Sequence, residues 1–155
     1  MTSATGIPER ILVLVNNDHE AGPVTKQAAA IAAGTGAVLY LIAVVDPADG
    51  DRYFGPGTIT EIDDAESQLI EEANVLRSLH EVTIEAAVLR GEPEDVVPPY
   101  LETEQIDLFV IDRSVLTHRS RFGRWRLADR LTALDEQISV LLVGSEVENI
   151  PEQIK

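Results

Sequence analysis

Six arginines lie close together in a chain that is otherwise strongly acidic. The sequence has 12 Lys and Arg against 27 Asp and Glu, which gives a net charge of −15. Residues 113–130 hold half of these cations and one acid, Asp129, so this segment carries +5 and the rest of the chain −20. A guanidinium group binds phosphate or carboxylate through two parallel hydrogen bonds. The segment therefore indicates an anion site or a contact surface. Its arginines are Arg113, Arg119, Arg121, Arg124, Arg126 and Arg130.

Two interpretations of this arginine cluster remain open. In the first, an anion is bound by the side chains nearest the end of the apolar run 107–112, which are Arg113, His118, Arg119 and Arg121. In the second, the arginines pair with acidic side chains on the same surface or across a dimer. We favour the second interpretation, because an arginine in so acidic a chain rarely lacks an acidic partner.

The composition excludes several classes of protein. The 155 residues include no cysteine, which rules out disulfides, thiolate metal sites and cysteine nucleophiles. The acidic surface argues against nucleic acid as a partner, since phosphates would be repelled. Acidic residues spread along the whole chain are typical of proteins from a high-salt cytoplasm, so we expect a halophilic source.

Localisation and domain organisation follow from the same sequence. The start, MTSATGIPER, lacks the pattern of a secretory signal. The longest apolar run, residues 37–45, is about half as long as a membrane helix. We therefore expect a cytoplasmic protein without a membrane segment. It should form one domain over residues 1–155, with a core at 10–144 and a polar tail at 145–155.

Strand-like and helix-like patterns alternate along the chain. Continuous apolar runs predict five strands, at residues 11–16, 37–46, 82–89, 107–112 and 138–144. Helices are predicted between them, at residues 24–36, 62–76, from Pro93 onward, and around 127–134. This alternation predicts an α/β fold, a three-layer sandwich with a mostly parallel sheet covered on both faces.

Three local details accompany these helices. The Gly-, Pro- and Asp-rich residues 47–57 predict a long loop before the second helix. Asp63 and Asp64 are expected in the first turn of that helix. Pro98 and Pro99 predict a kink or a restart in the helix that begins at Pro93.

The order of elements, together with four short stretches, resembles the universal stress protein family. These stretches are ILVLVNND (11–18), LRGEPEDVV (89–97), DLFVIDRS (107–114) and ISVLLVG (138–144). The resemblance implies a Rossmann-like, UspA-like parallel sheet in the order 3-2-1-4-5. It also implies a ligand crevice between strands one and four, at the switch point of the sheet. A homodimer through the fifth strand, Ile138 to Gly144, is implied as well.

The nucleotide motif of the ATP-binding branch is absent. In that branch the loop after strand four reads Gly-x2-Gly-x9-Gly-Ser/Thr, and its backbone amides cradle phosphate. Here Asp112 and Val115 stand at the first two glycines, and Trp125 with Arg126 at the final pair. The family's ribose-binding carboxylate is replaced by Asn16. The chain thus resembles the branch that does not bind ATP, and no cofactor is expected.

Two functional hypotheses follow. The leading one is a non-enzymatic stress-response module that regulates as a homodimer through protein contacts, with a partner that the sequence does not identify. No catalytic residues or metal ligands stand out. The alternative is a small-molecule sensor that binds a nucleotide such as ATP or AMP, or another anion, in the crevice. Its site would comprise Asn16, Asp18, Asp46, Arg113 and Ser114 and, by resemblance, the backbone of Val44 and Val45. Asp18 and Asp46 could equally act as a helix cap and a turn former.

Overall fold

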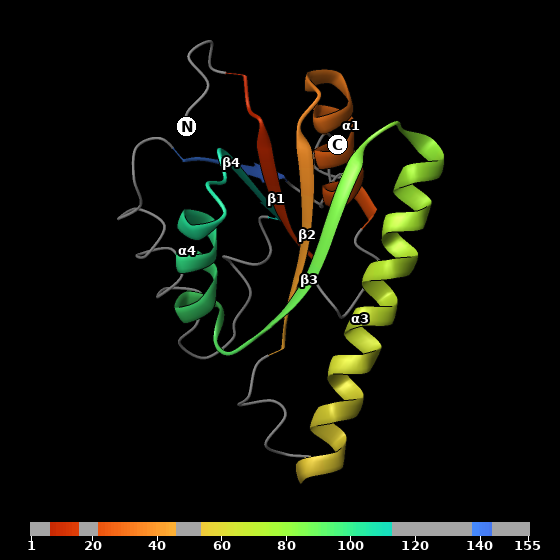
Figure 1. The fold of residues 1–155 in the computed structure, drawn as a ribbon, viewed down its shortest axis with the longest axis vertical. Coiled ribbons are helices and arrows are strands. Elements are labelled where there is room, and N and C mark those ends of the chain that lie inside the picture. Colours follow the sequence, from red (N-terminus) through yellow and green to blue (C-terminus); the bar gives the residue numbers. More distant parts are fainter. Residues whose placement is uncertain (1–6, 16–21, 46–53, 113–137, 144–155) are drawn as a thin grey trace, which may run out of the picture.

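A computed structural model shows a five-stranded parallel sheet with helices on both faces (Figure 1). It describes residues 7–15, 22–45, 54–112 and 138–143. The strands are β1 (Arg10–Val15), β2 (Val38–Val45), β3 (Thr83–Arg90), β4 (Leu108–Asp112) and β5 (Ser139–Val143). The helices are α1 (Gly22–Thr35), α3 (Phe54–Leu79) and α4 (Pro93–Thr103). The strand order is β3-β2-β1-β4-β5, which confirms the predicted fold class.

Strand β1 lies at the centre of the sheet. It pairs with β2 from Arg10↔Val38 to Val15↔Ala43, and with β4 on its other side. Ile11 and Val13 are fully buried. A parallel strand that is covered on both faces can be apolar at every position, which is why the run ILVLV predicted it correctly.

Side chains alternate between two cores, one on each face of the sheet. Ile11 and Val13 point to the core beneath α1 and α3. Leu12 and Leu14 point to the core beneath α4, which also contains Phe109. Figure 1 shows α4 on the near side of the sheet and α1 behind it. No described helix is both long enough and apolar enough to cross a membrane.

The start of α3 differs from the sequence prediction. The helix begins at Phe54 and includes the stretch that was expected to end the preceding loop. No acidic residue lies in its first turn, so the expected position of Asp63 and Asp64 was wrong. Pro56 is compatible with this early start, because the first four backbone N–H groups of a helix have no partner within it.

Helix α4 begins at Pro93, as predicted, but it does not restart. One continuous helix runs through Pro98 and Pro99 to Thr103. Val97 and Leu101 are 1% and 0% exposed, and both pack on the sheet. This burial compensates for the backbone hydrogen bonds that the prolines remove, so tertiary packing overrides the local signal.

A partly buried hydrogen bond joins α1 to α3. Thr25 is the one buried polar or charged residue in the described part of the chain. Its hydroxyl donates to Glu72 Oε2 at 2.6 Å. Since bonds to charged groups are stronger than neutral ones, this contact fixes the relative position of the two helices.

Replacing Thr25 by Val should lower the free energy of unfolding by about 1–3 kcal/mol, because the Glu72 carboxylate loses a donor. Chemical denaturation measures the change. Thr35→Val is the matched control: its hydroxyl donates to Ile31 O at 2.8 Å at the exposed end of α1. The control substitution should lower the free energy of unfolding by less than about 0.5 kcal/mol. Equal costs for the two variants would contradict a special role of the Thr25–Glu72 contact.

Candidate functional site

Strands β1 and β4 separate at their carboxyl ends. Their pairing stops at Val13↔Val110, although β1 continues to Val15 and β4 to Asp112. Beyond this point β4 pairs with β5 only, up to Asp112↔Val143. The separation falls where the chain order of the sheet reverses, which is where open α/β sheets place ligands.

Strand β2 extends past the end of its pairing with β1 at the same place. Its last pair with β1 is Ala43↔Val15, and the next two residues pair with β3. The Val38 N–H donates to the Glu9 carbonyl at 3.0 Å, so the even-numbered residues of β2 direct their backbone groups to β1. In this register the Val44 N–H donates to the Val15 carbonyl, and the Val44 carbonyl points to the β1 side beyond the last pair.

The turn from β3 to α4 depends on a glycine. Gly91 has φ +143°, and a Cβ built on it would lie 2.6 Å from Val96 Cγ1. The next residue, Glu92, is extended, and its carbonyl accepts hydrogen bonds from the N–H groups of Asp95 and Val96 at 2.8 and 3.0 Å. Gly91 thus allows the chain to turn sharply from the sheet into α4.

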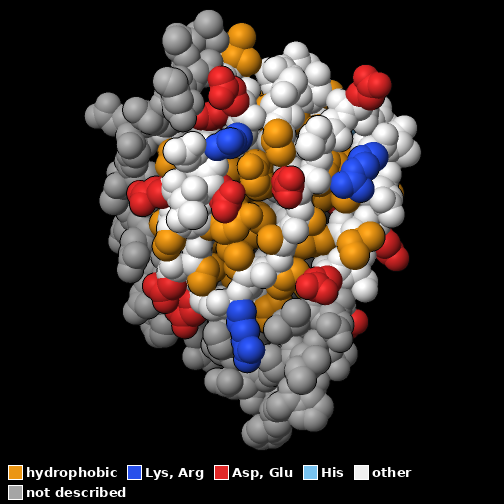
Figure 2. Space-filling model, in the orientation of Figure 1, with side chains coloured by type: hydrophobic (Ala, Val, Ile, Leu, Met, Phe, Trp, Pro, Cys, Tyr) orange, Lys and Arg blue, Asp and Glu red, His pale blue; other side chains and the backbone are white. Residues whose placement is uncertain are grey.

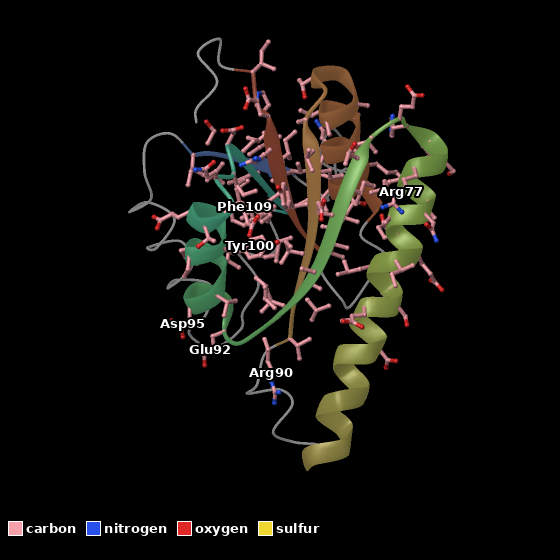
Figure 3. The ribbon with its side chains drawn as sticks, in the orientation of Figure 1. Arg77, Arg90, Glu92, Asp95, Tyr100 and Phe109 are labelled. Carbon is pink, nitrogen blue, oxygen red and sulfur yellow. The ribbon has the colours of Figure 1, made fainter. Side chains whose placement is uncertain are left out.

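Arg90 is a candidate residue that the sequence prediction missed. It is exposed, and it pairs in register with Val45 at the carboxyl end of the sheet. Figure 3 shows its side chain at the same end of the molecule as Glu92 and Asp95. Its position directly before Gly91, at the end of a predicted strand, could have identified it. The arginine cluster at 113–130 drew attention to another part of the chain.

The structure describes two of the ten predicted site residues, Val44 and Val45. They lie on opposite faces: Val45 belongs to the core beneath α1 and α3, and half-buried Val44 packs on the core beneath α4. The other eight lie outside the described residues. They are Asn16, Asp18, Asp46, Arg113, Ser114, His118, Arg119 and Arg121. Within the described part of the chain, no group of three His, Asp or Glu could hold a metal ion.

Comparisons with known proteins agree on one family. A model of the universal stress protein family matches residues 8–133. A search of curated proteins gives no match. Many solved structures share the fold, and three of them illustrate the range of similarity.

The first is a universal stress protein from Archaeoglobus fulgidus in complex with dAMP, at 21% identity over 88% of this chain and 98% of that chain, with a TM-score of 0.63. The second is a universal stress protein in complex with cAMP, at 20% identity over 88% and 97%, with a TM-score of 0.62. The third is an Arabidopsis thaliana family protein with AMP bound, at 17% identity over 88% and 91%, with a TM-score of 0.53. At these identities the likeness shows the fold alone.

Three glycine variants, one at this turn and two near the end of α1, test the role of Gly91. Gly91→Ala should be the most destabilising, by about 2 kcal/mol or more, because it combines positive φ with a clash against Val96. Gly36→Ala places a Cβ on a backbone of positive φ without a clash, since nothing lies within 4 Å of the added Cβ. It should lower the free energy of unfolding by about 1 kcal/mol.

Gly34→Ala, also with open space around the added Cβ, should be neutral or stabilising by up to about 1 kcal/mol. Chemical denaturation of the three variants gives the order. A cost for Gly91→Ala no greater than that for Gly36→Ala would contradict the clash.

Proposed function

Because the chain belongs to the universal stress protein family, we propose that it is a non-enzymatic stress-response module of the cytoplasm. It acts as a homodimer through protein contacts and does not bind ATP. The observation that carries this proposal is the outer strand β5, which presents apolar side chains to solvent. Val140 and Leu142 are 38% and 43% exposed, whereas Ile11 and Val13 of the central strand β1 are fully buried.

An outer strand of this kind favours a partner. Among the described strands, β5 pairs with β4 alone. No described strand pairs with its other edge, and proteins normally protect the backbone N–H and C=O groups of such an edge with charges, prolines or a covering element. The sequence of β5, SVLLV, has no such protection. A second copy related by a two-fold axis would satisfy the same groups on both subunits and bury the apolar side chains.

Charged substitutions in β5 test the homodimer. Val140→Lys combined with Leu142→Lys should convert the dimer to a monomer, because each subunit would place two buried cations in the interface. Static light scattering at low and high salt measures the mass. Ile70→Lys is the matched control, since Ile70 is an apolar residue of α3 that is 59% exposed. A wild-type monomer, or a dimer that survives the β5 substitutions, would refute this interface.

The proposal that ATP is not bound rests on the physics of the missing glycines. Backbone amides can surround a phosphate only where no side chain blocks the approach. Asp112 stands at the first glycine of the family motif, and Trp125 at the last. A carboxylate would repel phosphate, and an indole would occupy the space that the phosphate needs.

A second candidate function is favoured by the relatives. Three structures of this fold hold cAMP, dAMP or AMP. In a sensor of this kind, the side chain of Arg90 would join the predicted site residues, which already include the backbone of Val44. Arginine guanidinium groups would then bind the phosphate in place of the backbone amides of the glycine motif.

Thermal unfolding with millimolar ATP, AMP or cAMP separates the two functions. We expect no change in melting temperature for any of them. If the protein is a sensor, a ligand at about a hundred times Kd should raise its free energy of unfolding by about 2.7 kcal/mol. This corresponds to an increase of a few degrees in the melting temperature. In that case Arg113→Ala with Arg119→Ala should abolish the shift, whereas Lys155→Ala, which removes a cation outside the cluster, should preserve it.

A further inference from the structure

The face of the sheet beneath α4 is only partly covered. On the opposite face, Leu39 and Leu41 of β2 are fully buried under α1 and α3. Beneath α4, Ile42 of β2 is buried, but four other residues of β2 and β3 that pack on this core stay half-exposed; they are Tyr40, Val44, Ala87 and Leu89. Figure 2 shows hydrophobic side chains gathered in the centre of this face, with carboxylates among them.

Two tyrosines and two carboxylates lie together on this face. Tyr40 and Glu85 are register partners on β2 and β3. Tyr100 and Glu104 lie one turn apart at the end of α4. Tyr40 and Tyr100 pack on the same core beneath α4, which places the two pairs on one face. Burial raises the pKa of Tyr100, and the nearby charges of Glu104, Tyr40 and Glu85 raise this pKa further.

Two carboxylates of this face are without a hydrogen bond or an ion pair to the described residues. They belong to Glu85, which is exposed, and Glu104, which is half-buried. Arg10 of β1 lies beside them, but its guanidinium donates to the Glu104 backbone carbonyl and to Gln105 Oε1, at 3.3 and 3.2 Å. The face thus combines apolar area, aromatic rings and two carboxylates, with Arg10 bound to backbone and amide oxygens at its border. We call it the tyrosine surface; it comprises Tyr40, Glu85, Ala87, Leu89, Tyr100 and Glu104.

We propose that the tyrosine surface docks a cationic, amphipathic segment of a partner protein. Arginine or lysine side chains would lie over the tyrosine rings, between the two carboxylates, where cation–π attraction and charge complementarity act together. Apolar side chains of the same segment would pack on Ala87 and Leu89. Nucleic acids and anionic membranes do not fit, because the carboxylates repel phosphate. This inference rests on the proposed function through protein contacts and specifies the chemistry of the partner.

The strand order separates this surface from the proposed dimer interface. The tyrosine surface lies on β2, β3 and the end of α4, and β5 forms the opposite edge of the sheet from β3. Both contacts can therefore form at once. A homodimer would present two tyrosine surfaces, so a partner with two cationic segments would bind more tightly than one with a single segment.

A synthetic peptide with the sequence RSRFGRWRL is a suitable probe, because it alternates four arginines with aromatic and apolar residues. It corresponds to residues 119–127 of this chain. Fluorescence anisotropy of the labelled peptide measures its affinity for the full-length protein. Glu85→Lys and Glu104→Lys should each weaken binding by about fivefold or more, since each turns an attraction into a repulsion. Glu66→Lys, an equal change of charge at an exposed position of α3, should weaken it by less than about twofold.

A second peptide isolates the apolar contribution. Serine in place of Phe122, Trp125 and Leu127 keeps every charge and should lower the affinity by about tenfold or more. The proposal is overturned if the first peptide does not bind, if the serine peptide binds equally well, or if Glu66→Lys weakens binding as much as Glu85→Lys.

Glu85→Gln provides a milder variant, and circular dichroism establishes that each variant folds. Light scattering of the same variants keeps the test separate from the proposed function. A dimer that persists while peptide binding fails would refute the tyrosine surface alone. Loss of the dimer in the β5 variants with peptide binding intact would refute the dimer interface alone.

Discussion

The hydrogen-bonded position of β1, between β2 and β4, determines where the other described elements lie. At the amino end, Asp107 locks β1 to β4: its Oδ2 accepts hydrogen bonds from the N–H groups of Glu9 and Arg10 at 2.7 and 3.0 Å, and its own N–H donates to the Arg10 carbonyl at 2.9 Å. At the carboxyl end the pairing stops at Val13↔Val110. The two strands are held together at one end and separate at the other. The opening between β1 and β4 at the switch point is thus a consequence of strand pairing.

The strands could be predicted from the sequence because buried parallel strands have continuous apolar runs, and their ends were right to within about two residues. Local signals were misleading where packing dominated: α4 does not restart at Pro98, and α3 begins earlier than predicted. The site was harder to predict. The residue at which β1 and β4 separate leaves no mark in the sequence, since Leu14 and Val15 of β1 and Ile111 of β4 continue the apolar runs beyond it. Arg90 was missed because the arginine cluster at 113–130 drew attention to another part of the chain.

The described helices cover the two faces of the sheet to different extents. A helix is about 10 Å wide and covers about two strands that lie about 4.8 Å apart. The 26 residues of α3, together with α1, cover β1 and β2 on one face. On the other face the described helix, α4, has 11 residues, and Tyr40, Val44, Ala87 and Leu89 stay half-exposed. Tyrosine suits such a boundary, since its ring packs on the core and its hydroxyl reaches solvent. Both proposed contact surfaces therefore arise where the layers do not cover the sheet completely.

The loss of the glycine motif changes the kind of anion site that this fold can build. Backbone amides select phosphate by shape, because they require contact at hydrogen-bond distance. Arginine side chains act over a longer reach and respond mainly to charge. In this chain the arginine segment 113–130 has a net charge of +5 and the other residues together have −20, so the rest of the molecule opposes the positive field of the segment. A free anion must approach the arginines against the negative field of the rest of the molecule. Acidic side chains of the same chain or of a second copy would instead be held near the arginines by folding or by dimer formation. The electrostatics of the whole chain thus favour arginines that make protein contacts over arginines that capture a ligand.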